Sequence, residues 1–277
     1  MIDENSFNEA FDEVVNNNDK IIVLYSGIWT FINNLNFNIK DNSQLPKTLL
    51  EIIEKKIGKN KTLFLPSFTG KIFSNKKIIN FKRNIDKENG VLSLSALKKN
   101  YYRTKQPIHS YLVYGDTSKI KKTKILSSWG ENSLLEFFSK NNARICTLGL
   151  PWNKGCAYLH RFEEIFNVPW RYKKKISSKV KINKKNLSKY SEIKFCSSNK
   201  YKLIYDYKPF VKYIEQAKSF KKSTNNLIKF ESIKASCLDK IGFNIFSQNP
   251  WIIIKNIRET KNWIKNFKDL EILESLN

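Results

Sequence analysis

Residues 148–173, LGLPWNKGCAYLHRFEEIFNVPWRYK, carry the strongest signal for fold and function in this sequence. A short apolar run at 144–148 leads into a loop with Gly, Pro, Asn and Gly, and a helical segment follows. His160 and Glu163 are three residues apart, so a helix places them on one face about one turn apart. A carboxylate at that spacing fixes the tautomer of the imidazole and stabilises the imidazolium. A general base needs both of these effects.

The His-x-x-Glu pattern is also found on ordinary helix surfaces, so this alternative stays open. The chain has only two histidines, His109 and His160, and both lie near loops rich in Ser, Gly, Pro and Asn. Histidine has an unperturbed pKa of about 6.5, which suits proton transfer near neutral pH. No CxxC or HxxxH spacing occurs, so we expect no metal site.

The composition predicts a globular, cytoplasmic protein. Of 277 residues, 41% are hydrophobic and 13% aromatic, which is enough for a sizeable core. No apolar run approaches the roughly 20 residues that span a bilayer, and the acidic N-terminus is unlike a secretory signal. The four cysteines are widely spaced and are expected to be reduced thiols: Cys146, Cys156, Cys196 and Cys237.

The formal charge of +25 allows three interpretations. One is compositional drift, because Lys, Asn and Ile are abundant throughout the chain. The second is an anionic small ligand such as a diphosphate, and the third is a nucleic acid. Lysines are densest at 173–185, but no RNP signature, zinc finger or single basic helix is present, so we expect no nucleic-acid partner.

Apolar periodicity predicts strands that alternate with helices, and therefore an α/β layered fold with at least partly parallel strand pairing. Between them we expect a polar loop at 71–89, and the basic stretch 173–198 has only weak periodicity. We expect one domain over 1–277, with 174–277 as an elaboration that closes over the site. The predicted helices are 7–15, 45–57, 91–100, 133–139, 209–220, 232–243 and 251–267, and the predicted strands are 19–25, 62–65, 110–114, 143–148, 201–207 and 227–230.

Small residues follow three of the predicted strands, at Ser26 and Gly27, at 67–70 and after Leu148. Ligands of α/β folds gather at the carboxyl ends of strands, where small residues let backbone amides approach them. Ordinary turns use the same residue types. No GxGxxG or GxxxxGK[ST] motif is present, so dinucleotide and P-loop interpretations have little support.

Six blocks in order resemble the aminoglycoside 3-N-acetyltransferase family, also called the antibiotic N-acetyltransferase fold. The resemblance covers roughly residues 20–175, and both histidines fall inside blocks. The blocks are VLYSGIWTF (23–31), TLFLPSFTG (62–70), NGVLSLSALK (89–98), YRTKQPIHSYLVYG (102–115), SSWGENSLLEFF (127–138), and RICTLGL with CAYLHRFEE (144–150 and 156–164).

The resemblance implies a mixed central sheet flanked by helices, and acyl transfer from acetyl-CoA or another short acyl-CoA to an amine, without a metal. His160 would be the general base and Glu163 would orient it. Backbone amides near Ser26 would be candidate donors to the oxyanion, and Arg103 could meet a phosphate. The residues expected on the coenzyme A side are Tyr25, Ser26, Gly27, Ile28, Thr69, Arg103, Thr104, His109 and Ser110.

The chain departs from the family pattern at three positions near the expected site. Tyr25 stands where the family usually has His, and Gly27 where it has a second Ser. Ala157 stands where the family has Thr, which removes a hydroxyl one helical turn before His160. A polar contact to the substrate is therefore lost or moved.

The segment after the predicted helix indicates the acceptor. Its Val-Pro-aromatic-Arg-Tyr pattern resembles relatives that acylate amino sugars for surface polysaccharides such as lipopolysaccharide. We therefore expect a nucleotide-linked amino sugar, with dTDP as the expected nucleotide and its diphosphate near Arg171, Tyr172 and Lys173.

Three alternative functions remain compatible with the sequence. The first alternative is an aminoglycoside 3-N-acetyltransferase that confers resistance. The second is a cysteine hydrolase using Cys156, which lies four residues before His160. The third is a basic module that binds nucleic acid or polyphosphate. No membrane partner is expected, and a homodimer is compatible with the sequence.

Overall fold

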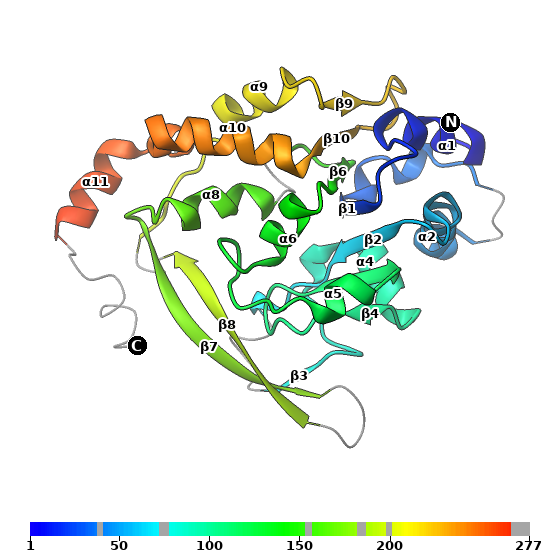
Figure 1. The fold of residues 1–277 in the computed structure, drawn as a ribbon. Helices are drawn as coiled ribbons and strands as arrows, with labels where there is room; N and C mark the ends of the chain where they lie inside the picture. The colour runs from blue at the N-terminus through cyan, green and yellow to red at the C-terminus, as the bar shows by residue number, and fades with distance from the viewer. Residues whose placement is uncertain (38–40, 72–77, 153–156, 182–186, 198–200, 267–277) are drawn as a thin grey trace.

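The computed structural model describes residues 1–37, 41–71, 78–152, 157–181, 187–197 and 201–266. A mixed seven-stranded sheet is covered by helices on both faces, and a three-stranded sheet lies beside it (Figure 1). The predicted α/β fold with a mixed sheet is therefore confirmed. In the described part of the chain, no helix has the length and apolar character needed to cross a membrane.

The main sheet has the strand order β4-β5-β2-β1-β6-β10-β9. Its central strand β1 pairs in parallel with β2 and β6, and the outer strands pair antiparallel. Every residue of β1 is buried, as expected for a parallel strand covered on both faces. The strands are β1 (Ile21–Ser26), β2 (Thr62–Pro66), β4 (Tyr102–Arg103), β5 (Tyr111–Gly115), β6 (Arg144–Leu148), β9 (Lys221–Lys222) and β10 (Phe230–Lys234).

Two hydrophobic cores lie on opposite faces of this sheet. In β1, Ile22 and Leu24 belong to the core under α1, α2 and α4, whereas Val23 and Tyr25 belong to the core under α6, α8, α9 and α10. The helices are α1 (Glu4–Val14), α2 (Leu45–Ile57), α4 (Val91–Lys98), α5 (Ser118–Lys122), α6 (Leu134–Lys140), α8 (His160–Ile165), α9 (Lys208–Glu215), α10 (Ala235–Gln248) and α11 (Ile257–Asn266).

Local sequence signals explain the elements that were predicted best. Helix α2 has the predicted bounds, with Pro46 in its first turn. Gly58 ends it at a φ of 61°, which glycine adopts without a steric penalty. Helix α6 starts after Ser133, whose side chain accepts a hydrogen bond from the backbone N–H of Glu136.

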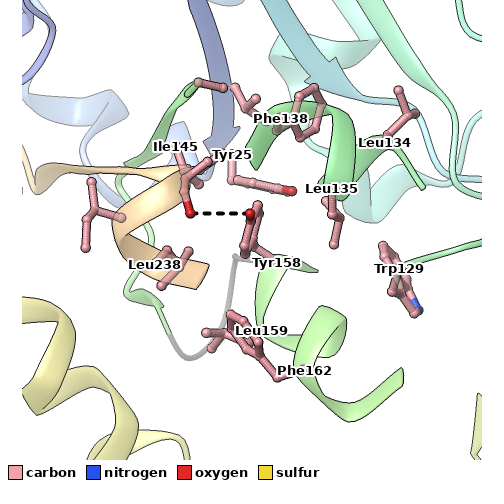
Figure 2. Close-up of a cluster of buried hydrophobic side chains, with 14 of the residues drawn as sticks. Tyr25, Trp129, Leu134, Leu135, Phe138, Ile145, Tyr158, Leu159, Phe162 and Leu238 are labelled. Carbon is pink, nitrogen blue, oxygen red and sulfur yellow. Dashed lines mark hydrogen bonds between the residues drawn. The ribbon is translucent and has the colours of Figure 1, made fainter. Parts of the chain in front are cut away.

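Helix α8 is fixed against α10 by polar and apolar contacts. Arg161 contacts Asp239 with Nε–Oδ1 at 3.1 Å, and the Tyr158 hydroxyl donates to the same carboxylate at 2.8 Å. The Phe162 ring is fully buried and packs against Gly242. Figure 2 shows Tyr158 and Phe162 in the core that also holds Tyr25, so the helix is tied to the central strand.

Residues 71–89 were predicted as loop but contain β3 (Ile78–Asn80) and a 3-10 turn, Lys87–Asn89. The basic stretch, for which no element was predicted, forms an antiparallel hairpin of β7 (Arg171–Lys181) and β8 (Leu187–Ser197). Strand β3 pairs in parallel with β7 and completes the small sheet. The sequence pattern did not predict β7 because most of the strand is exposed and rich in lysine, and only Ser178 and Val180 are buried.

Several predictions in the C-terminal region were wrong. The strand predicted at 227–230 is β10, which covers Phe230–Lys234, so the helix predicted from 232 begins only at Ala235. The helix predicted at 251–267 is a 3-10 turn, Pro250–Ile253, followed by α11 from Ile257. Residues 201–207 form no strand, because their only ladder contact is an isolated bridge between Tyr205 and Ile254. Their alternation instead turns Tyr205 and Tyr207 towards His160. The helix predicted at 209–220 ends at Glu215.

Candidate active site

The first residue of α8 is His160, and the helix brings Glu163 directly beneath it. The Nδ1 atom of His160 lies 2.5 Å from Oε2 of Glu163, as the three-residue spacing predicted. The His160 side chain is 30% exposed, whereas the Glu163 side chain is fully buried. The hydrogen bonds of His160 to described residues use Nδ1.

Three further groups hold the second oxygen of Glu163. The Trp170 indole donates to Oε1 at 2.9 Å, the Tyr205 hydroxyl donates at 3.0 Å, and Nε of Arg171 lies 3.1 Å away. Burial by itself would raise the pKa of Glu163, but the charges of Arg171 and His160 and these hydrogen bonds lower the pKa to about 2. Glu163 is therefore a fixed anion next to the imidazole.

The tautomer of His160 follows from these contacts. A guanidinium only donates hydrogen bonds, and Nη2 of Arg171 lies 3.2 Å from Nδ1 of His160. Nδ1 is much closer to the Glu163 carboxylate, so we assign its proton to that contact. The Nη2 group donates instead to the Tyr205 hydroxyl at 2.9 Å. The assignment leaves Nε2 as the basic nitrogen.

Aromatic rings surround the imidazole of His160. The Trp129 ring is 5.7 Å away, and the rings of Tyr205 and Tyr207 are each 6.4 Å away, centroid to centroid. The Glu164 carboxylate orients Trp129, because it accepts the backbone N–H groups of Trp129 and of the following glycine, each at 2.9 Å. The site is thus walled by rigid aromatic groups, which offer broad contact surfaces to a sugar or to a cationic amine.

A cavity of about 490 Å³ lies at the carboxyl ends of β1 and β2. Its lining includes the predicted residues Tyr25, Ser26, Gly27 and Ile28, together with Phe68. The remaining lining residues were not predicted to bind a ligand: Trp29, Ile32, Pro46, Pro66, Lys71, Asp86, Lys87, Glu88, Asn89, Gly90, Val91 and Leu150.

Backbone geometry shapes this cavity. The Gly27 N–H donates to the Leu148 carbonyl at 2.8 Å, so this amide is already occupied and does not serve as an oxyanion donor. Gly149 has a φ of 69°, and a Cβ on it would lie 2.6 Å from the Gly27 carbonyl oxygen. Gly90 has a φ of 85°, and a Cβ there would lie 2.9 Å from the carbonyl oxygen of Ser26. Glycines are therefore required where the loops meet at the cavity.

The other residues expected on the coenzyme A side do not line this cavity. Thr69 donates to the Pro107 carbonyl at 2.5 Å, and the Thr104 hydroxyl accepts the Tyr111 N–H at 2.8 Å. Buried Arg103 donates to the hydroxyl of Ser110 and to three backbone carbonyls. These residues order the loops, and Arg103 is not exposed towards a phosphate.

His109 lies in the loop before β5, and its Nδ1 contacts the Glu192 carboxylate. Its ring is 3.9 Å from that of Trp129 and 5.5 Å from that of Phe68, centroid to centroid. Phe68 also lines the cavity. The two histidines are thus connected to the cavity through Phe68 and Trp129.

The three predicted acceptor residues differ in their surroundings. Arg171 is bound to Glu163 and Tyr205, so its guanidinium positions the active site rather than facing a free phosphate. Tyr172 is half-buried and Lys173 is exposed. Residue 156, the cysteine of the alternative hydrolase, lies outside the described residues.

Sequence reasoning missed the aromatic residues and the second carboxylate. Trp170 lies in the quoted Val-Pro-Trp-Arg segment, so its proximity to Glu163 could have been suspected. Tyr205 and Tyr207 come from a segment misread as a strand. Glu192 is more than eighty residues from His109, so only the tertiary fold brings the two side chains together.

Fold and site together fit a class: an α/β enzyme with an imidazole held by a buried carboxylate, which is the arrangement that a general base needs. Neither His160 nor Glu163 lines the cavity, and Trp129 and Phe68 lie between them and it. A family model described as aminoglycoside 3-N-acetyltransferase matches residues 38–233. The chain belongs to this family, and it is an acyl-CoA-dependent N-acetyltransferase.

Solved structures show the same fold. AAC-IIIb in a binary complex with CoASH has a TM-score of 0.69 and 14% identity, covering 89% of this chain and 97% of that one. Aminoglycoside acetyltransferase AAC(3)-IIb has a TM-score of 0.67 and 14% identity, covering 90% and 98%. AAC-VIa bound to sisomicin has a TM-score of 0.66 and 10% identity, covering 88% and 97%. A comparison with curated proteins finds no significant match.

Proposed function

We propose that this protein transfers a short acyl group from coenzyme A to a primary amine of an amino sugar, with His160 as general base. The observation that carries the proposal is the 2.5 Å contact between Nδ1 of His160 and a Glu163 carboxylate that is fully buried and ionised. This arrangement leaves Nε2 as the basic nitrogen of His160. It also stabilises the imidazolium that forms when the amine loses its proton.

The residues present fit an acyl-CoA thioester as donor. The 490 Å³ cavity has a largely apolar lining, which suits an extended apolar arm. Its charged lining residues are two lysines and two acids, Lys71, Lys87, Asp86 and Glu88, and Lys71 is paired with Glu88. The apolar part of the lining, and not its charge, is therefore what supports a coenzyme A arm. The thioester supplies the electrophilic carbonyl carbon. His160 holds the proton that the amine releases, while Glu163, Arg171 and Tyr205 keep the ring in place. We also propose that the enzyme works in the cytoplasm, because acyl-CoA thioesters are made there.

An aminoglycoside is the acceptor that the comparisons support. AAC-VIa is bound to sisomicin, and AAC(3)-IVa is in complex with a gentamicin. The aromatic rings of Trp129, Tyr205 and Tyr207 around His160 would receive such a sugar ring face-on. The charge of +25 disfavours this acceptor at long range, because an aminoglycoside is a polycation.

A nucleotide-linked amino sugar is the second candidate, and the charge of strand β7 favours it. Four lysines alternate along one face of the strand that begins beside Glu163, and all are exposed. They make no ion pairs with the described residues, and Lys179 stands directly opposite Lys189 of β8. A diphosphate would relieve this repulsion. The four are Lys173, Lys175, Lys179 and Lys181.

An acceptor screen with acetyl-CoA and 3-hydroxybutyryl-CoA tests the proposal. Release of free thiol is measured with sisomicin, with gentamicin and with a dTDP-linked amino hexose. We expect amine-dependent thiol release with at least one of these sugars, and a rate lower by about 10²–10⁴ from His160→Asn. Release that is independent of any amine, or equal in the variant, would refute the proposal.

The acceptor class is decided by a matched pair of lysine variants. If the acceptor is nucleotide-linked, Lys173→Ala raises its KM several-fold, as expected for loss of one charge-assisted contact. Lys240→Ala on α10, which also removes one exposed lysine, is the control and leaves the KM unchanged. If aminoglycosides are preferred and neither variant changes the KM, the nucleotide-linked candidate is excluded.

A further inference from the structure

The two histidines of this chain are held in the same way. Nδ1 of His160 contacts the carboxylate of Glu163, and Nδ1 of His109 contacts the carboxylate of Glu192. Both glutamate side chains are fully buried. The second pair joins the loop before β5 to strand β8 and therefore arises only from the tertiary fold.

Glu192 is bound as an anion. Its Oε2 accepts the backbone N–H groups of Ile108 at 3.0 Å and His109 at 3.3 Å, and its Oε1 accepts the Ser128 hydroxyl at 2.8 Å. Burial alone would raise the pKa of Glu192, but the charge and hydrogen bond of His109 and these donors lower it. The imidazole proton on Nδ1 is thereby fixed towards Glu192, and Nε2 of His109 is the nitrogen left for exchange.

Both imidazoles contact the same tryptophan. The centroid of Trp129 is 3.9 Å from that of His109 and 5.7 Å from that of His160. Phe68 lines the cavity and packs edge-on against both His109 and Trp129. Neither histidine lines the cavity, but His109 contacts the lining residue Phe68 directly, whereas His160 is linked to Phe68 through Trp129. His160 is the imidazole on the side of Tyr205 and Tyr207.

Acyl transfer from a thioester to an amine moves two protons. The amine loses one as its nitrogen bonds to the carbonyl carbon, and the sulfur gains one as the carbon–sulfur bond breaks. We propose that His109 is the general acid that protonates the leaving sulfur, while His160 is the base on the amine side. This inference rests on the proposed function.

The proton balance closes without another reactant. The His160 imidazole takes the proton of the amine and becomes an imidazolium. The His109 imidazolium gives its Nε2 proton to the thiolate and becomes neutral. Exchange with solvent then restores both rings before the next turnover. A general acid is useful here because the leaving thiol has an ordinary pKa of about 8.5, above neutral pH.

The charged groups near His109 are few. Glu192 on β8 is the only described carboxylate in contact with the ring, and Glu164 on α8 lies behind the backbone of Trp129. Arg103 on β4 turns its guanidinium towards Ser110 and backbone carbonyls. Arg161 on α8 donates to the backbone carbonyl of Trp129 at 3.5 Å, and His160 lies across the Trp129 ring. The charge of Glu192 therefore decides how stable an imidazolium is at His109.

The test compares Glu163→Gln with Glu192→Gln, two matched removals of one buried charge each. The pH dependence of kcat is measured by thiol release at saturating acyl-CoA. An imidazolium is less stable without its carboxylate, so each variant moves the limb governed by its own histidine to lower pH. We expect Glu163→Gln to move the acid limb and Glu192→Gln to move the alkaline limb. If Glu192→Gln leaves the alkaline limb in place, or moves both limbs together, His109 is not the general acid.

A second variant keeps the test decisive if Glu192→Gln does not fold. His109→Asn retains an amide donor near the position of Nδ1, so the contact to Glu192 is preserved, but it carries no transferable proton. We expect kcat to fall about 10²-fold, the alkaline limb to vanish, and the KM for acyl-CoA to stay within about threefold. An unchanged profile shape in His109→Asn would assign the residue a structural role only. Wild-type protein that releases no thiol with any amine would instead refute the proposed function itself.

Discussion

Glu163 combines complete burial with a pKa of about 2, against an ordinary value of 4.5. A carboxyl whose pKa is lowered on folding stabilises the folded state above the unfolded-state pKa, and this stabilisation is lost as the pH falls through the folded-state pKa. The loss therefore occurs between about pH 4.5 and about pH 2. The source of the stabilisation is mainly Arg171, which is left without its partner when Glu163 is neutral.

Glu163→Gln should consequently reduce the free energy of unfolding by roughly 3 kcal/mol near neutral pH. The difference from wild type should shrink as the pH falls towards 2, because wild-type Glu163 then becomes protonated as well. Urea unfolding at several pH values measures it, with the exposed Glu131→Gln as control. A difference that stays constant down to about pH 2 would show that the Glu163 charge does not stabilise the fold.

Residue-level prediction succeeded where the partners are close in sequence. His160 and Glu163 are three residues apart, so helix geometry alone places them together. Arg171 was expected to bind phosphate because sequence shows its charge but not its partner. Its burial against Glu163 and Tyr205 arises from the tertiary fold and could not be inferred locally.

Helix α8 depends on α10 for its position. A Cβ at Gly242 would lie 2.1 Å from the Phe162 ring, which is fully buried and has no space to retreat. Gly242→Ala should therefore destabilise the protein by about 1–3 kcal/mol, as overpacking does. It should also lower kcat, because His160 lies on α8 together with the displaced Phe162. Thermal unfolding and thiol release measure both effects.

The matched control for this helix is Lys240→Ala, an exposed position two residues away, which should change stability by no more than about 0.5 kcal/mol. If Gly242→Ala were as stable and active as this control, α8 would not depend on its packing against α10.

At the scale of elements, sequence patterns predicted the buried strands and amphipathic helices but not the small sheet. Strand β1 and helix α2 have continuous or periodic apolar residues, so their burial is visible in sequence. Strand β7 is exposed along most of its length, and its alternation is carried by lysines. Apolar and polar residues alternate at 201–207 because Tyr205 and Tyr207 both pack against His160. A sequence pattern with a period of two does not distinguish such an extended segment from a strand.

The net charge of +25 acts on the whole molecule. Anionic acyl-CoA should be attracted at long range, and salt screens this attraction over about 10 Å at 0.1 M. We expect kcat/KM for acyl-CoA to fall several-fold between about 0.05 M and about 0.5 M KCl. For a polycationic aminoglycoside the same change should raise kcat/KM, because salt screens the repulsion.

Steady-state kinetics in KCl, with an uncharged osmolyte as control, measure these slopes. A kcat/KM for acyl-CoA that is independent of salt would indicate that the charge is compositional and has no role in binding. The sign of the acceptor slope separates an anionic acceptor from a cationic one.

The central claim is that one imidazole, fixed by a buried carboxylate, takes the proton from the acceptor amine. The most direct measurement is the turnover of His160→Asn, together with its affinity for coenzyme A by calorimetry. We expect kcat to fall by about 10²–10⁴ and the Kd for coenzyme A to stay within about threefold of wild type. A variant that keeps wild-type turnover across the pH range would contradict this claim.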